Sequence, residues 1–264
     1  MPSDVKAQQG SIATTEDAFL GGKLTIAQAV YGSRAGLDAV FLAAACPAKS
    51  GDRVLDAGTG SGIVALAIAR RVEGVNVTGV EINADLCELA RSNATRNGLA
   101  DRAAFHCGDV SAPLSQLFAL GLAPDSFDHS VANPPFLEAG EARLPQGAML
   151  NRAHAAGPGE LESWIKCLVA LVKPRGTVTI VHRADALPRL LGLLQGRIGG
   201  LAVYPLFPRD GAPASRILVQ GRKGSRAPLR LMRGMILHGA GNGFTADVEP
   251  ILRNGSGLEL APGE

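Results

Sequence analysis

The feature of this sequence that most constrains its fold is a regular alternation of short apolar strands and helices, which begins at Arg53. The pattern predicts strands at 53–56, 75–82, 103–107 and 127–132, with helices at 63–69 and 83–98. It continues with a helix at 160–172, a strand at 177–181, a helix at 188–198 and a hairpin-like pair of strands at 201–207 and 217–220. Strands that alternate with helices form parallel sheets covered on both faces, so the sequence predicts an α/β protein with a doubly wound sheet.

The chain before this alternation has a different character. Residues 1–22 are polar and contain glycine, so we expect a flexible N-terminal arm there. The sequence then becomes apolar, and Leu37, Val40 and Phe41 follow helical spacing. Because no repeat or low-complexity tract divides the rest, residues 23–264 are predicted to form a single domain.

A glycine-rich turn follows the first predicted strand and marks the expected ligand site. It reads Asp56-Ala57-Gly58-Thr59-Gly60-Ser61-Gly62. Ligands of doubly wound sheets bind beyond the carboxyl ends of the strands, where glycines let the backbone approach them closely. The spacing Gly-x-Gly-x-Gly differs from the Gly-x-Gly-x-x-Gly of dinucleotide binders, and Asp56 would repel a pyrophosphate. A ligand with sulfonium and ammonium groups, such as S-adenosylmethionine (SAM), would be attracted by this carboxylate.

Two further carboxylates end the next two strands. Glu81 could accept hydrogen bonds from both ribose hydroxyls of SAM, and Asp109, which follows Gly108, could accept one from the adenine amino group. A solvated turn residue is the alternative interpretation of Glu81, and a helix N-cap is the alternative for Asp109.

The tetrapeptide Asn133-Pro134-Pro135-Phe136 ends the fourth strand, beside the first strand of the predicted sheet. Two prolines remove two backbone N–H donors, so the Asn133 side-chain oxygen and the Pro134 carbonyl remain as acceptors. Acceptors for both hydrogens of a planar amino group favour a pyramidal nitrogen and stabilise the positive charge that develops on methylation. Phe136 would stack on a flipped base. A rigid turn is the structural alternative.

With these motifs, the sequence resembles the class I SAM-dependent methyltransferases that carry an Asn-Pro-Pro-aromatic motif, most of all the bacterial tRNA(Val) adenine-N6 methyltransferases. The resemblance runs from about Leu24 to Arg253 and includes Tyr31-Gly32-Ser33-Arg34-Ala35-Gly36-Leu37-Asp38 and Phe127-Asp128. It implies a Rossmann-like sheet of seven strands whose last strand is antiparallel.

The resemblance also implies roles for individual residues. Gly58 and Gly60 would contact the methionine part of SAM, while Glu81 would bind the ribose and Asp109 the adenine. The full set expected to bind the cofactor is Asp56, Gly58, Gly60, Gly62, Glu81, Asp109 and Asn133. The residues expected to hold the target base and carry catalysis are Asn133, Pro134 and Phe136.

The net charge of +2 conceals a strongly basic region. The stretch from Arg175 to Arg233 contains eleven Arg or Lys and two acids, so it carries +9 and the rest of the chain −7. Such a concentration favours polyanions, although a solvated surface is the alternative. We expect an RNA partner, by the resemblance a tRNA, held by this stretch and by the loop from Leu137 to Gly159. Candidate contacts in that loop are Arg143, Arg152 and His154.

Several alternatives remain open at this point. Protein-glutamine N5 and rRNA guanine-N2 methyltransferases look similar at the same motifs, because their substrates also present a planar nitrogen. An NAD-dependent oxidoreductase is disfavoured by the glycine spacing, and a non-catalytic RNA-binding protein by the intact Asn-Pro-Pro-Phe motif.

Composition excludes other classes. No apolar run approaches the roughly 18 residues of a membrane span, and the polar start lacks a signal peptide. The four cysteines lie far apart without metal-ligand spacing. We therefore expect a cytoplasmic enzyme with no metal ion and no membrane contact.

Overall fold

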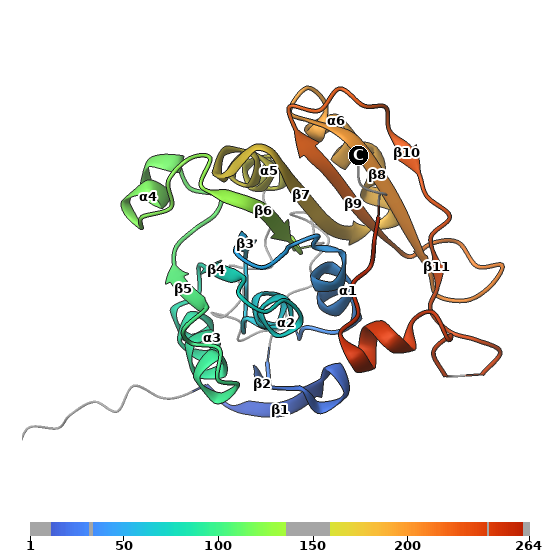
Figure 1. Ribbon diagram of the computed structural model, residues 1–264, viewed down its shortest axis with the longest axis horizontal. Helices are drawn as coiled ribbons and strands as arrows, with labels where there is room; N and C mark the ends of the chain where they lie inside the picture. Colours follow the sequence, from blue (N-terminus) through green and yellow to red (C-terminus); the bar gives the residue numbers. More distant parts are fainter. Residues whose placement is uncertain (1–11, 32–33, 136–158, 242, 261–264) are drawn as a thin grey trace, which may run out of the picture.

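The computed structural model describes residues 12–31, 34–135, 159–241 and 243–260 (Figure 1). Its centre is a sheet of nine strands. Seven of them form the main body, in the spatial order β5 (Ala103–Cys107), β4 (Asn76–Glu81), β3 (Arg53–Ala57), β6 (Phe127–Ala132), β7 (Val172–Arg183), β9 (Arg216–Lys223) and β8 (Ile198–Phe207). Two short strands, β10 (Arg230–Leu231) and β11 (Met235–Ile236), add to the outer edge of β8.

Strand directions confirm the expected topology. The five strands from β5 to β7 pair in parallel, and β9 runs antiparallel to both of its neighbours. The predicted hairpin is the pair β8–β9, and β9 is the antiparallel seventh strand. The added strands β10 and β11 have two residues each, too few for a periodic pattern to predict them.

Helices cover both faces of the sheet (Figure 1). One core contains α1 (Leu37–Ala45), α2 (Ile63–Arg71) and α3 (Ala84–Arg96). The other contains α4 (Leu114–Ala119), α5 (Glu160–Leu171) and α6 (Leu187–Leu194). Residues 63–69 of α2 are apolar and all buried, because this part of the helix packs against the sheet, α1 and strand β2 (Leu24–Ala29). Only its last turn is polar, with Arg70 and Arg71.

The N-terminal segment corrects one expectation. Strands β1 (Thr14–Phe19) and β2 (Leu24–Ala29) form an antiparallel hairpin through the turn Leu20–Gly22. Strand β2 packs on α2 and α3 (Figure 1), and its Leu24 and Ile26 are fully buried. The prediction of a flexible arm over 1–22 is therefore wrong from Thr14 onward. The apolar residues of β2 fix this strand against the helices, and the polar strand β1 then pairs with it. Residues 1–11 lie outside the described part of the chain.

The topology brings the predicted motifs to one edge of the sheet. Strand β3 pairs with β4 on one side and β6 on the other, so that Asp56 lies opposite both Gly79 and Val131. The carboxyl ends of these strands and of β7 form what we call the site edge. The glycine turn, Glu81 and Asn133 all follow directly at this edge.

Candidate active site

The glycine turn is held tightly against the neighbouring strand. The backbone N–H groups of Gly58 and Thr59 both donate to the Val80 carbonyl, at 2.8 and 3.0 Å. Gly58, Gly60 and Gly62 have φ angles of +69°, +57° and +88°, a region that glycine adopts without strain. The alternation of glycines is thus required by the backbone of the turn itself.

The three glycines have different surroundings. A Cβ atom on Gly58 would lie 2.2 Å from Cη2 of Trp164, and one on Gly62 would lie 3.1 Å from both Ala90 and Phe105. A Cβ atom on Gly60 would meet no described atom within 4 Å. Gly58 and Gly62 are therefore needed for packing, whereas Gly60 faces open space in which a ligand could lie.

Glu81 is buried and joins the glycine turn to the second strand. Its Oε2 accepts a hydrogen bond from the Gly60 N–H at 2.9 Å, and its Oε1 accepts one from the Asn83 N–H at 2.9 Å. Asn83 is the N-cap of α3, where its side chain accepts hydrogen bonds from the Asp85 and Leu86 N–H groups. Only 5% of Glu81 is exposed, which excludes a solvated turn residue. Since each carboxylate oxygen has two lone pairs, the fixed side chain can still accept hydroxyl donors.

Asp56 lies inside the turn, with 1% of its surface exposed. Its Oδ2 accepts hydrogen bonds from the Thr59 hydroxyl at 2.5 Å and from the Ala65 N–H at 3.2 Å. Burial raises the pKa of Asp56 to about 7; the two hydrogen bonds act against this rise and the Glu81 carboxylate adds to it. A nearby cation would stabilise the ionised form.

Asp109 is half-buried beyond β5, and its Oδ1 accepts a hydrogen bond from the Ser111 N–H at 2.7 Å. Helix α4 begins only at Leu114, with Pro113 at its N-cap, so the helix N-cap alternative for Asp109 is wrong. The Gly108 N–H donates to the Glu81 carbonyl at 2.9 Å, and this bond keeps Asp109 at the site edge.

Asn133 and Pro134 follow β6 at the same edge, and Pro134 is buried. The Oδ1 atom of Asn133 is also buried and has no hydrogen-bond partner among the described residues. An unpaired buried acceptor costs about 1–3 kcal/mol, so a donor is expected there when the site is filled. Phe136 lies outside the described residues, as do Arg143, Arg152 and His154 of the loop.

These observations fit SAM. The space at Gly60, the fixed Glu81 carboxylate and the half-buried Asp109 suit a ligand with hydroxyl and amino donors. Helix α2 begins at Ile63 directly after the turn, and helix N-termini bind carboxylates. The Asn133 oxygen, without a partner in the part of the chain that the structure describes, suits a substrate that brings an N–H donor.

Trp164 is a site residue that the sequence did not reveal. It lies on α5, is 7% exposed, and its ring occupies the space that Gly58 leaves free. Its Nε1 atom is buried without a partner among the described residues, although buried tryptophans usually donate this hydrogen bond. No motif spacing connects Trp164 with the glycine turn; only its status as the single tryptophan could have drawn notice.

The basic stretch does not form one face at the site edge. Strand pairing places Arg216 opposite Arg183 at the carboxyl end of β7, but Arg222 opposite Thr177. Six residues of strand separate these positions by about 20 Å. Lys223 is engaged at the far end, where its Nζ lies 2.6 Å from Oδ1 of Asp125. Only part of the basic stretch can therefore act together with the candidate active site.

Two further features concern the described residues as a whole. No group of three or more His, Cys, Asp or Glu side chains is arranged there to hold a metal ion. Within the same residues, no helix has the length and apolar character that crossing a membrane requires.

The parallel sheet with an antiparallel seventh strand and the glycine turn at its carboxyl edge define a class I methyltransferase. Comparison with known proteins agrees: a family model described as a methyltransferase domain matches residues 48–188, slightly more than half of the chain. The chain belongs to this family and is a SAM-dependent methyltransferase.

Individual relatives refine the comparison. The chain is 32% identical over 178 residues to the tRNA1(Val) (adenine(37)-N6)-methyltransferase of Porphyromonas gingivalis, covering 66% of this chain and 68% of the relative. It is 35% identical over 167 residues to the release factor glutamine methyltransferase of Chlorobaculum tepidum, covering 63% and 49%. A crystal structure of a predicted O-methyltransferase from Agrobacterium tumefaciens superposes with a TM-score of 0.72 at 27% identity, covering 84% of this chain and 99% of that one.

Proposed function

We propose that the protein transfers a methyl group from SAM to the exocyclic N6 amino group of an adenine in RNA, most specifically in tRNA(Val). The observation that carries this proposal is the buried Oδ1 of Asn133, which has no hydrogen-bond partner among the described residues and lies at the same sheet edge as the glycine turn. The tRNA(Val) adenine methyltransferase among the relatives supports the choice of substrate.

The residues at the site edge would divide the work of binding. Glu81 would accept the ribose hydroxyls, Asp109 the adenine amino group, and Gly60 would leave room for the methionine part. Asp56 would attract the cationic groups of SAM by its charge and without direct contact, because its Oδ2 already accepts a hydrogen bond within the turn. When bound there, SAM supplies an electrophilic methyl group on a positively charged sulfur.

Asn133 and Pro134 would prepare the substrate nitrogen. The lone pair of an adenine amino group is delocalised into the ring, which makes the nitrogen a weak nucleophile. If the Asn133 Oδ1 and the Pro134 carbonyl each accept one N–H, the nitrogen becomes pyramidal and its lone pair is available. The same acceptors stabilise the positive charge that develops on this nitrogen.

Substitution of Asn133 by Ala tests this role. We expect kcat for methyl transfer to fall by about 100-fold or more, because an acceptor aligned with developing charge is lost. Binding of S-adenosylhomocysteine, measured by calorimetry, should weaken far less than kcat falls, because Asn133 is only one of the seven residues expected to contact the cofactor. Methyl transfer by Asn133→Ala at the rate of the parent protein would refute the proposal.

A protein glutamine is the second candidate acceptor, favoured by the similarity to a release factor glutamine methyltransferase. A side-chain amide also presents a planar nitrogen with two hydrogens, so Asn133 would act on it in the same way. Labelled SAM incubated with total tRNA, rRNA and protein, followed by nucleoside and amino-acid analysis, distinguishes the substrates. N6-methyladenosine in tRNA supports the first proposal, and N5-methylglutamine supports the second.

A further inference from the structure

We propose that Asn93 is a positioning residue that fixes the glycine turn for cofactor binding by tying it to the N-terminal hairpin. The inference rests on the proposed use of this turn for SAM. Asn93 lies on α3, is fully buried, and does not belong to any motif that the sequence suggested.

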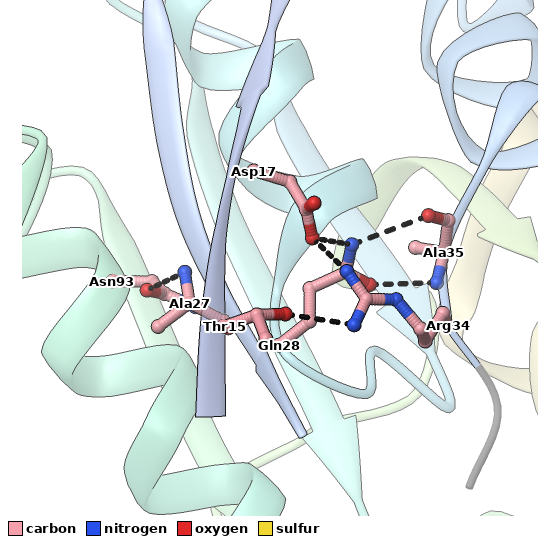
Figure 2. A network of polar contacts seen from close by, with 7 residues as sticks. All are labelled: Thr15, Asp17, Ala27, Gln28, Arg34, Ala35 and Asn93. Atoms are coloured by element: carbon pink, nitrogen blue, oxygen red, sulfur yellow. Dashed lines mark hydrogen bonds and ion pairs between the residues drawn. The ribbon is translucent and has the colours of Figure 1, made fainter. Parts of the chain in front are cut away.

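The Asn93 amide bridges two parts of the chain. Its Oδ1 accepts the Ala27 N–H at 2.9 Å, and its Nδ2 donates to the Ala27 carbonyl at 2.9 Å (Figure 2 shows the first of these bonds). The same Nδ2 donates its second hydrogen to the Ser61 carbonyl at 2.9 Å. Ser61 lies between Gly60, which faces open space, and Gly62, which ends the turn. One side chain thus binds both the hairpin and the turn.

Asn97, the C-cap residue of α3, contacts the hairpin in the same way, but none of its described hydrogen bonds reaches the glycine turn. Its Oδ1 accepts the Thr25 N–H at 3.0 Å, and its Nδ2 donates to the Thr25 carbonyl at 2.8 Å and to the Asn93 carbonyl at 2.8 Å. Residues four apart on a helix therefore bind residues two apart on β2. Asn97 docks the hairpin without touching the glycine turn, so it provides a matched control for Asn93.

The hairpin is also anchored at its open end, where β1 begins and β2 ends, so that it can serve as a fixed support (Figure 2). Gln28, 3% exposed, accepts the Ala35 N–H at 2.7 Å and donates to Asp17 Oδ2 at 2.8 Å. Arg34 pairs with the same Asp17 carboxylate and donates to the Thr15 hydroxyl at 2.7 Å. These bonds connect both hairpin strands to the segment that leads into α1.

The hydrogen bonds of Asn93 and Glu81 fix the shape of the proposed cofactor site. The Gly60–Ser61–Gly62 backbone has two left-handed glycines and would sample many conformations without restraint. The Glu81 carboxylate restrains it from one side through the Gly60 N–H, and Asn93 restrains it from the other through the Ser61 carbonyl. A turn already ordered before binding gives tighter binding because less entropy is lost.

The test compares Asn93→Ala with Asn97→Ala. Both variants lose the pair of bonds to β2. Because Asn93 is fully buried and Asn97 only half-buried, Asn93→Ala should lose more in melting temperature, so binding is compared at a temperature at which both variants are folded. Only Asn93→Ala should also weaken binding of S-adenosylhomocysteine in calorimetry, by about fivefold or more, as expected for the loss of a buried hydrogen bond. If Asn93→Ala does not fold, Asn93→Ser compared with Asn97→Ser replaces it, because one hydroxyl hydrogen cannot donate to both the Ala27 and the Ser61 carbonyl.

The outcomes are separable. Equal dissociation constants for the two variants would overturn the role of Asn93, as would an unchanged constant in Asn93→Ala. A parent protein that binds no S-adenosylhomocysteine would instead overturn the proposed function. Hydrogen exchange gives a further readout: amides of the turn should exchange faster in Asn93→Ala than in Asn97→Ala.

Discussion

At the scale of single residues, the two buried carboxylates of the glycine turn behave differently. Glu81 accepts backbone N–H groups with both of its oxygens, whereas Asp56 depends on one hydroxyl and one N–H that its Oδ2 accepts. Burial raises the pKa of Asp56 to about 7. The uptake of a proton by this residue should therefore be visible in the pH dependence of stability.

We predict that Asp56→Asn becomes more stable relative to the parent protein as pH rises. In the unfolded chain Asp56 ionises near its ordinary pKa of 3.8, but in the fold it holds its proton until about pH 7. Its contribution to stability is therefore present below pH 3.8 and lost as pH rises toward 7. Each pH unit accounts for at most about 1.4 kcal/mol.

Chemical denaturation of the protein without ligand, at several pH values from 4 to 8, measures this difference. His182 contributes a slope of the opposite sign, because burial lowers its pKa to about 4, but this contribution cancels between variant and parent. Asp109→Asn serves as the control for loss of a carboxylate at the same edge. Parallel pH curves for Asp56→Asn and the parent protein would contradict the prediction.

At the scale of elements, the turn between β3 and α2 contains three glycines at alternate positions. Two of them pack against neighbouring side chains, and the third leaves space for a ligand. Gly58 and Gly62 make room for Trp164 and for the side chains of α3 and β5, and Gly60 faces open space. A helix that begins directly after such a turn depends on it for its orientation. Substitution should therefore separate the two functions of the turn.

We predict that Gly60→Ala and Gly62→Ala have contrasting effects. Both place a side chain at positive φ, at a cost of about 1–2 kcal/mol. In Gly62→Ala the new methyl group also meets Ala90 and Phe105 at 3.1 Å, which adds roughly 1–3 kcal/mol of overpacking. Thermal melts should show the larger loss for Gly62→Ala, while titration with S-adenosylhomocysteine should show the larger loss of affinity for Gly60→Ala. Equal effects on both measurements would argue against the distinction.

At the scale of the whole molecule, the sheet order decides which charges can act together. Helix α6 begins beyond β7 at the site edge, and the β8–β9 connection returns there, so Arg189 and Arg209 lie on that side. Arg222 lies at the far end of β9, and Arg226 follows that strand. An RNA bound at the site edge should respond to the first pair and not to the second.

We therefore predict that Arg189→Gln combined with Arg209→Gln weakens tRNA binding and reduces the slope of log Kd against log salt by about one to two. The control, Arg222→Gln combined with Arg226→Gln, removes the same charge at the far end and should leave the slope unchanged. Filter binding at several salt concentrations measures both. A change in slope that is larger for the control would indicate that the RNA binds at the opposite end of the sheet.

Much of the fold could be predicted because its periodic elements are long enough to carry a pattern. The parallel strands from β3 to β7 and helices α1, α2, α3 and α5 appear at or near their expected residues. Helix α4, the β1–β2 hairpin and the two edge strands were not predicted, because they are short or depend on partners distant in sequence. Leu24 and Ile26 are apolar on account of α2 and α3, which begin 37 residues or more further along the chain.

The sequence alone determined the chemistry available at the site: carboxylates at the ends of neighbouring strands, a flexible glycine turn and a donor-poor Asn-Pro-Pro segment. Only the tertiary structure decided how that chemistry is used. In the folded chain, neighbouring side chains pack against Gly58 and Gly62, and Asn133 Oδ1 has no described hydrogen-bond partner. The Asn93 side chain forms hydrogen bonds with both Ala27 and Ser61. The physical reason is that local patterns depend on backbone preferences, whereas burial and hydrogen-bond pairing depend on residues brought together from far along the chain.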